Sequence, residues 1–174
     1  MFTQTAEYAL RIVVYLASLK GTPATIRQIA GVTKVPEGYL AKVLQSLSRA
    51  KILSSQRGLH GGSTLSREPG RISVYDVIEA VAPLPRITTC PLGLKSHGVN
   101  LCPLHRRMDD AMASVERAFR GSTIADLLAE PTTSTPLCEG PVAHPVVFEE
   151  PEKPAPIEPI VPLTVTGRRG NRKQ

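Results

Sequence analysis

The sequence predicts a mainly α-helical fold with a small β-hairpin, followed by one long helix and a disordered tail. Apolar residues recur at helical spacing over the first 130 residues, and two short strand-like segments around a glycine-rich tip interrupt them once. Nine of the sixteen prolines then fall between Pro131 and Pro162, where helical periodicity ends. With no Trp and only 4% aromatic residues, the core must be aliphatic.

Three helices are expected within the first fifty residues. The first covers residues 5–20. The second begins after Thr25 and runs to about residue 32, because Thr25 and Gln28 have the spacing of a capping box. The third starts at Pro36, and its apolar face leaves an outward face without an acidic residue, formed by Gly38, Lys42, Gln45 and Arg49.

A hairpin is expected after the third helix. Residues 52–57 have the pattern of a strand, 58–62 that of a glycine-rich tip and 63–66 that of a returning strand. This order of elements is typical of a winged helix-turn-helix domain, in which the third helix can enter a DNA major groove. The hairpin, called the wing, can then touch the minor groove or the backbone. A helical domain whose hairpin has no binding role is the alternative.

The remaining apolar patterns predict a fourth helix over residues 72–81, a long helix from Leu104 and a short one over 123–128. The apolar positions of the long helix step by four and three, like a coiled-coil seam: Leu104, Met108, Ala111, Val115 and Ala118. Such a stripe favours a second copy of the chain, and thus a homodimer, over packing on the chain's own domain.

These patterns divide the chain into four parts. We expect a winged helix-turn-helix DNA-binding domain over residues 1–82 and a cysteine-containing sensor loop over 83–103. A dimerisation helix with a short terminal helix follows over 104–130, and a disordered Pro-rich tail over 131–174.

The positive charge is concentrated at the N-terminal end. The net charge is +6, and residues 1–75 hold ten Lys and Arg against three Glu. This asymmetry favours nucleic acid over a membrane surface as the partner, with a merely solubilising surface as the alternative. Because the sequence has no apolar run of membrane-spanning length and no basic segment ahead of an apolar N-terminal stretch, we expect a cytoplasmic protein without membrane contact.

Two Cys-Pro-Leu units, starting at Cys90 and Cys102, enclose His97 in the predicted loop. His105 lies three residues beyond Cys102 on the first turn of the long helix, where it can face the same side as the thiolate. These ligands could hold zinc or a 2Fe-2S cluster, and a pair of structural or reactive thiols is the alternative. We do not expect an enzyme, because the sequence contains no nucleophile elbow, Walker loop or dinucleotide fingerprint.

Segments 5–10, 39–47 and 55–62 read TAEYAL, YLAKVLQSL and SQRGLHGG. In combination they resemble the family of winged-helix regulators that includes the iron–sulfur cluster regulator IscR and the nitric-oxide-responsive repressor NsrR. The resemblance covers about residues 1–130. It implies a dimeric transcription regulator, often a repressor, that binds a double-stranded DNA operator and in many members senses nitric oxide, redox state or iron–sulfur supply through a cluster.

The resemblance also implies roles for single residues. Gly38, Ala41 and Lys42 would face the major groove, and Arg57 would reach from the wing into the minor groove, where the negative potential is strong. Together with neighbouring polar and basic positions, the predicted DNA-binding residues are Arg27, Gly38, Ala41, Lys42, Gln45, Arg49, Arg57 and His60.

Cluster-binding members of that family typically carry three evenly spaced cysteines in the loop. Cys90 and Cys102 match the outer two, whereas Ser96 stands at the middle position. The resemblance therefore implies a mixed ligand set, formed by Cys90, Cys102 and His105 with Glu7 from the partner subunit or His97. We expect an iron–sulfur cluster of the 2Fe-2S type, and a member that has lost its cluster is the alternative.

The expected function is that of a homodimeric DNA-binding repressor whose operator affinity changes with the cluster or redox state of the Cys90–Cys102 loop. Two alternatives remain open at this point. One is a metal-free regulator that senses redox state through the same two thiols. The other is a zinc-stabilised adaptor protein whose Pro-rich tail recruits a partner.

Overall fold

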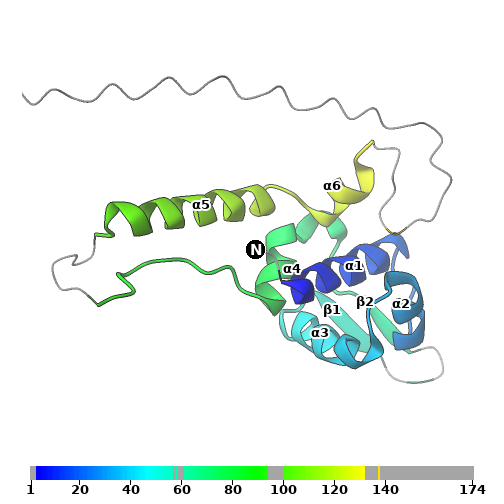
Figure 1. Cartoon of the computed structure of the whole chain (residues 1–174). Helices are drawn as coiled ribbons and strands as arrows, with labels where there is room; N and C mark the ends of the chain where they lie inside the picture. Colours follow the sequence, from blue (N-terminus) through cyan, green and yellow to red (C-terminus); the bar gives the residue numbers. More distant parts are fainter. Residues whose placement is uncertain (1–2, 57, 59–60, 94–99, 132–136, 138–174) are drawn as a thin grey trace, which may run out of the picture. The chain divides into compact units, whose positions relative to one another are not determined.

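The computed structural model of the chain describes residues 3–56, 58, 61–93, 100–131 and 137, and its elements follow the expected order (Figure 1). They are α1 (Gln4–Ser18), α2 (Ile26–Thr33), α3 (Glu37–Arg49), β1 (Leu53–Gln56), β2 (Gly62–Leu65), the 3-10 turn η1 (Pro69–Arg71), α4 (Val74–Val81), α5 (Pro103–Arg120) and α6 (Ile124–Ala129). The prediction of a mainly helical fold with a hairpin wing is therefore confirmed. The predicted disordered tail lies outside the described residues, except at positions 131 and 137.

Local capping sets the start of several helices. At α2, Thr25 Oγ1 accepts a hydrogen bond from the Gln28 N–H at 3.3 Å, and Gln28 Oε1 accepts one from the Thr25 N–H at 2.8 Å. The same reciprocal pattern opens α4 at Ser73 and α6 at Thr123. Because a capping box involves residues only three positions apart, it can be identified from sequence alone.

An aliphatic core is built around α1, which contacts α2, α3, α4 and α6. α1 buries eight of its fifteen residues. The large side chains that are fully buried are aliphatic and come from α1, α2, α3, α4, α6 and the segments beside them: Ile12, Leu16, Ile29, Leu40, Leu47, Ile52, Ile72, Ile78 and Ile124. Burial of this apolar surface is the main force that holds the helices around α1.

The hairpin is tied to the start of α2. β1 and β2 pair antiparallel, from Leu53 opposite Leu65 to Gln56 opposite Gly62. Ser63 and Ala24 form a further antiparallel bridge, in which the Ser63 N–H donates to the Ala24 carbonyl at 2.8 Å and the reverse bond spans 3.1 Å. The wing and the helix-turn-helix segment therefore share backbone hydrogen bonds.

The long helix α5 has no buried residue. Its C-terminal end meets the core, where Phe119 packs against the cluster of Ala6, Val74 and Ile78. Within the described ranges, no helix is both long and apolar enough to cross a membrane.

Candidate nucleic-acid interface and cysteine site

The outward face of α3 is exposed along its length. α3 buries Leu40, Val43, Leu44 and Leu47 against the core. Six of the eight residues predicted to bind DNA are exposed on α2 and α3, namely Arg27, Gly38, Ala41, Lys42, Gln45 and Arg49. The other two, Arg57 and His60, lie outside the described residues. The two helices contact each other, so the six positions belong to one helix-turn-helix unit.

Residues of α2 and a residue of α1 both fix the turn between α2 and α3. Lys34 adopts the left-handed conformation with φ 56° and ends α2. Buried Thr33 donates its hydroxyl to the Ile29 carbonyl at 2.7 Å, and Arg11 of α1 donates to the Thr33 carbonyl at 3.1 Å. Arg11 also pairs with Glu7 at 2.5 Å. Glu7, which the family resemblance offers as a ligand to a partner's metal, is thus engaged by Arg11 within its own chain.

Tyr39 is an exposed aromatic residue on α3 that sequence reasoning did not assign to the site. Its side chain is 53% exposed, and its ring meets the ring of Tyr8 edge-on, with centroids 6.0 Å apart. The Tyr8 hydroxyl accepts a hydrogen bond from Gln4 Nε2 at 2.8 Å. An aromatic side chain next to Gly38 on an otherwise polar outward face is the signal that could have identified it.

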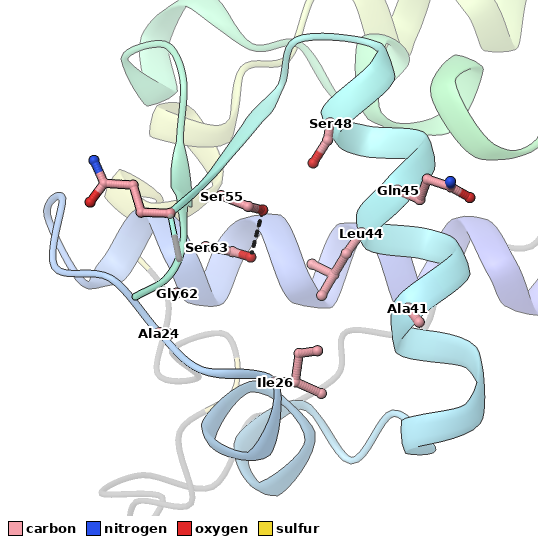
Figure 2. A pocket seen from close by; sticks show the side chains of 10 residues that line it. Ala24, Ile26, Ala41, Leu44, Gln45, Ser48, Ser55, Gly62 and Ser63 are labelled. Atoms are coloured by element: carbon pink, nitrogen blue, oxygen red, sulfur yellow. Dashed lines mark hydrogen bonds between the residues drawn. The ribbon is translucent and has the colours of Figure 1, made fainter. Parts of the chain in front are cut away.

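A hollow of about 460 Å³ separates α3 from the hairpin (Figure 2). α3 forms one side, the hairpin forms the opposite side, and Ile26 at the start of α2 lies at one end of the space between them. The lining residues carry no charged side chain: Ala24, Ile26, Ala41, Leu44, Gln45, Ser48, Ser55, Gln56, Gly62 and Ser63. Two of the predicted DNA-binding residues, Ala41 and Gln45, are among them.

Two of the predicted metal ligands come together at the start of α5. Cys102 is the N-cap residue of α5, and its Sγ lies 3.4 Å from Nδ1 of His105. Cys90 is half-buried in the segment before the helix. Within the described part of the chain, no group of three His, Cys, Asp or Glu residues is placed to hold a metal ion. His97 and Ser96 lie outside the described residues.

An ion-pair network, which we call the Arg86 clasp, connects α5 to the segment before it, which carries Arg86 and Cys90. The guanidinium of Arg86 donates to both carboxylate oxygens of Asp109 at 2.7 and 2.8 Å and to Glu116 at 2.8 Å. The Ile87 N–H also donates to Asp109, at 2.9 Å. The hydrogen bonds from Arg86 and Ile87 lower the pKa of Asp109 to about 2, against the opposing effect of desolvation.

A second contact joins α5 to α4. The Arg120 guanidinium lies 3.6 Å from the ring centroid of Tyr75 and pairs with Glu116 at 2.9 Å. Desolvation, followed by a hydrogen bond with Glu79, raises the pKa of Tyr75. The segment that carries Cys90, α5 and α4 are therefore linked through polar side chains.

The predicted apolar seam of α5 is exposed. Leu104 is 64% and Met108 50% exposed, Ala111 and Ala118 are exposed, and Val115 is half-buried. Isolated exposed apolar residues are common on protein surfaces, whereas a stripe along a helix indicates a partner surface.

Comparison with known proteins agrees with this fold. The Rrf2 family profile, described as that of an iron-dependent transcriptional regulator, matches residues 2–130. A protein of Aquifex aeolicus (strain VF5) named as an HTH-type transcriptional regulator is 31% identical over 131 residues, which cover 74% of this chain and 91% of that protein.

Solved structures similar to the chain include two named regulators. CymR, the global cysteine regulator of B. subtilis, aligns with TM-score 0.61 and 26% identity over 74% of this chain and 96% of its own. IscR of T. potens aligns with TM-score 0.61 over 76% of this chain and 88% of its own, and at 24% identity this likeness concerns the fold alone.

Proposed function

Because the chain belongs to the Rrf2 family of transcriptional regulators, we propose that it is a homodimeric repressor that places α3 in the major groove of its operator and its wing at the minor groove. The observation that carries this proposal is the exposed face of α3. Its predicted contact residues include Lys42 and Arg49 and no acid, and Arg27 of α2 is exposed beside them. Such a face suits the negative potential of a duplex.

Operator selection from a random duplex library, followed by a salt titration, tests this proposal. A protein whose side chains neutralise several phosphates loses affinity steeply between 50 and 200 mM salt, roughly 10³-fold for six contacts. The variants Lys42→Ala and Arg57→Ala should each weaken binding. Duplex binding that is insensitive to salt would contradict the proposal.

The proposed sensor is an iron–sulfur cluster held by Cys90, Cys102 and His105, with Glu7 of the partner subunit or His97 as a further ligand. The contact between Cys102 and His105 supports this ligand set, because thiolate and imidazole are donors that iron accepts. Among the described residues, neither Cys90 nor any other donor forms a group of three with this pair, so the proposed site also needs Cys90 and a donor from His97 or the partner subunit to approach it. When bound, such a cluster supplies a redox-active group whose potential depends on its ligands and hydrogen bonds.

The cluster can be tested on protein purified without oxygen, by its visible spectrum and by iron and sulfide assays. Visible absorption with stoichiometric iron and sulfide, lost in both Cys90→Ala and Cys102→Ala, would support the proposal. Colourless wild-type protein free of metal would refute it.

A metal-free thiol regulator is the second candidate function. The pairing of Cys102 with His105, without a third ligand among the described residues, favours it over a zinc-stabilised adaptor. It predicts a colourless protein whose operator affinity responds to oxidant and reductant, and whose response disappears in Cys102→Ser.

A further inference from the structure

The hollow between α3 and the hairpin suggests how one DNA strand is held, an inference that rests on the proposed function. In a duplex, the major groove and the neighbouring minor groove are separated by one sugar-phosphate strand. With α3 in the major groove and the wing at the minor groove, this strand must cross the space between them. We propose that the hollow seats this strand, and that Ile26 packs against its deoxyribose.

The shape of the hollow suits a strand. Its two sides belong to α3 and to the hairpin, which are the two elements that address different grooves (Figure 2). On the hairpin side, Ser63 forms two backbone hydrogen bonds with Ala24, and its hydroxyl lies 3.3 Å from that of Ser55. Gln45 and Gln56 lie on opposite sides as exposed amides. Amide groups of this kind commonly donate to phosphate oxygens.

The uncharged lining of the hollow suits the neutral deoxyribose of the strand better than its charged phosphates. Its lining has no charged side chain, and Ile26, Ala41 and Leu44 give it an apolar wall. The basic residues Arg27 and Lys42 are exposed on the same two helices without lining the hollow. A deoxyribose therefore fits the interior, while the phosphates on either side of it can meet the exposed Arg27 and Lys42 of the same two helices.

Ile26 carries the proposal because its side chain is 49% exposed at the start of α2. Val32 provides a matched control, since it is an apolar residue of the same helix, 40% exposed and absent from the lining of the hollow. Substitutions at both positions leave the core intact, and thermal unfolding of each variant checks this.

The experiment measures the affinity of the full chain for a selected operator over a range of salt concentrations. Ile26→Ala should weaken binding about 3- to 10-fold with an unchanged salt slope, because it removes an apolar contact. Ile26→Glu should weaken binding at least 10-fold. Ile26→Lys should bind more tightly, with a slope steeper by about one unit, because it adds a phosphate contact. Val32→Ala, Val32→Glu and Val32→Lys should each stay within about 3-fold of wild type.

Equal changes in operator affinity for the Ile26 and Val32 variants would overturn the proposal that the hollow seats a DNA strand, since they would reflect overall charge alone. Unchanged affinity in the Ile26 variants, with Lys42→Ala still weakened, would also overturn it while leaving the proposed function intact. If the wild-type protein bound no duplex at all, the proposed function would fail and this proposal with it.

Discussion

Gly62 leaves no room for a side chain, because a Cβ at this position would lie 2.7 Å from the Ala24 carbonyl oxygen. The neighbouring bridge between Ala24 and Ser63 requires this close approach. Gly62→Ala should therefore lower the free energy of unfolding, by about 1–3 kcal/mol as for other overpacked sites. Urea denaturation measures the change.

Gly31 serves as the control for this substitution. It lies within α2, and a Cβ there would meet nothing within 4 Å. Gly31→Ala should raise the free energy of unfolding by up to about 1 kcal/mol, because alanine favours the helix. If both alanine variants had the same stability, the close approach at Gly62 would not matter to the fold.

Gly38 is a position at which a substitution is expected to change operator binding without lowering the stability of the fold. A Cβ at this position meets no atom within 4 Å, and the residue is exposed in the first turn of α3. Gly38→Leu should therefore fold as stably as wild type, yet bind the operator at least 10-fold more weakly if the face of α3 lies close to the bases. Equal affinity in a quantitative binding assay would move the interface away from this end of α3.

At the scale of secondary structure elements, the Arg86 clasp should respond to acid. The pKa of Asp109 lies near 2, below its usual value of 3.8, so the clasp stabilises the folded state above about pH 4 and weakens as the pH falls towards 2. Hydrogen-exchange protection factors of residues 103–120, which correct for the pH dependence of intrinsic exchange, should accordingly fall over this range. Asp109→Asn should show the faster exchange already at neutral pH.

Asp110→Asn is the control for the clasp. Asp110 is the exposed neighbour of Asp109, and its carboxylate forms no ion pair within the described part of the chain. It should exchange like wild type. Equal exchange in both variants would show that the clasp does not hold α5.

The elements were predictable from sequence wherever short-range signals define them. The capping boxes at Thr25, Ser73 and Thr123 mark helix starts, and the glycine-rich tip marks the hairpin. The Arg86 clasp was not predictable, because Arg86 and Asp109 are 23 positions apart and meet only in the folded chain. The hollow was missed for the same reason, since α2, α3 and the hairpin all contribute to it.

At the scale of the whole molecule, the exposed seam of α5 should join two copies of the chain. Met108→Glu places a carboxylate in the centre of the stripe and should produce a monomer, as measured by light scattering after size exclusion. Arg117→Glu introduces the same group at an exposed position outside the stripe and should leave the dimer intact. A wild-type monomer, or dissociation of both variants, would contradict a dimer built on this seam.

In the proposed function, the state of the cysteine site controls DNA binding. The most direct measurement is the operator affinity of protein purified without oxygen, before and after removal of iron and sulfide, with Cys102→Ala in parallel. The cluster and the operator DNA are two ligands of one protein, and their coupling free energy sets the difference in operator affinity between the cluster-containing and the stripped form. A coupling of 1.4 kcal/mol gives a difference of about 10-fold. Cys102→Ala should bind like the stripped protein. Equal operator affinity of a cluster-containing protein and its stripped form would contradict the account.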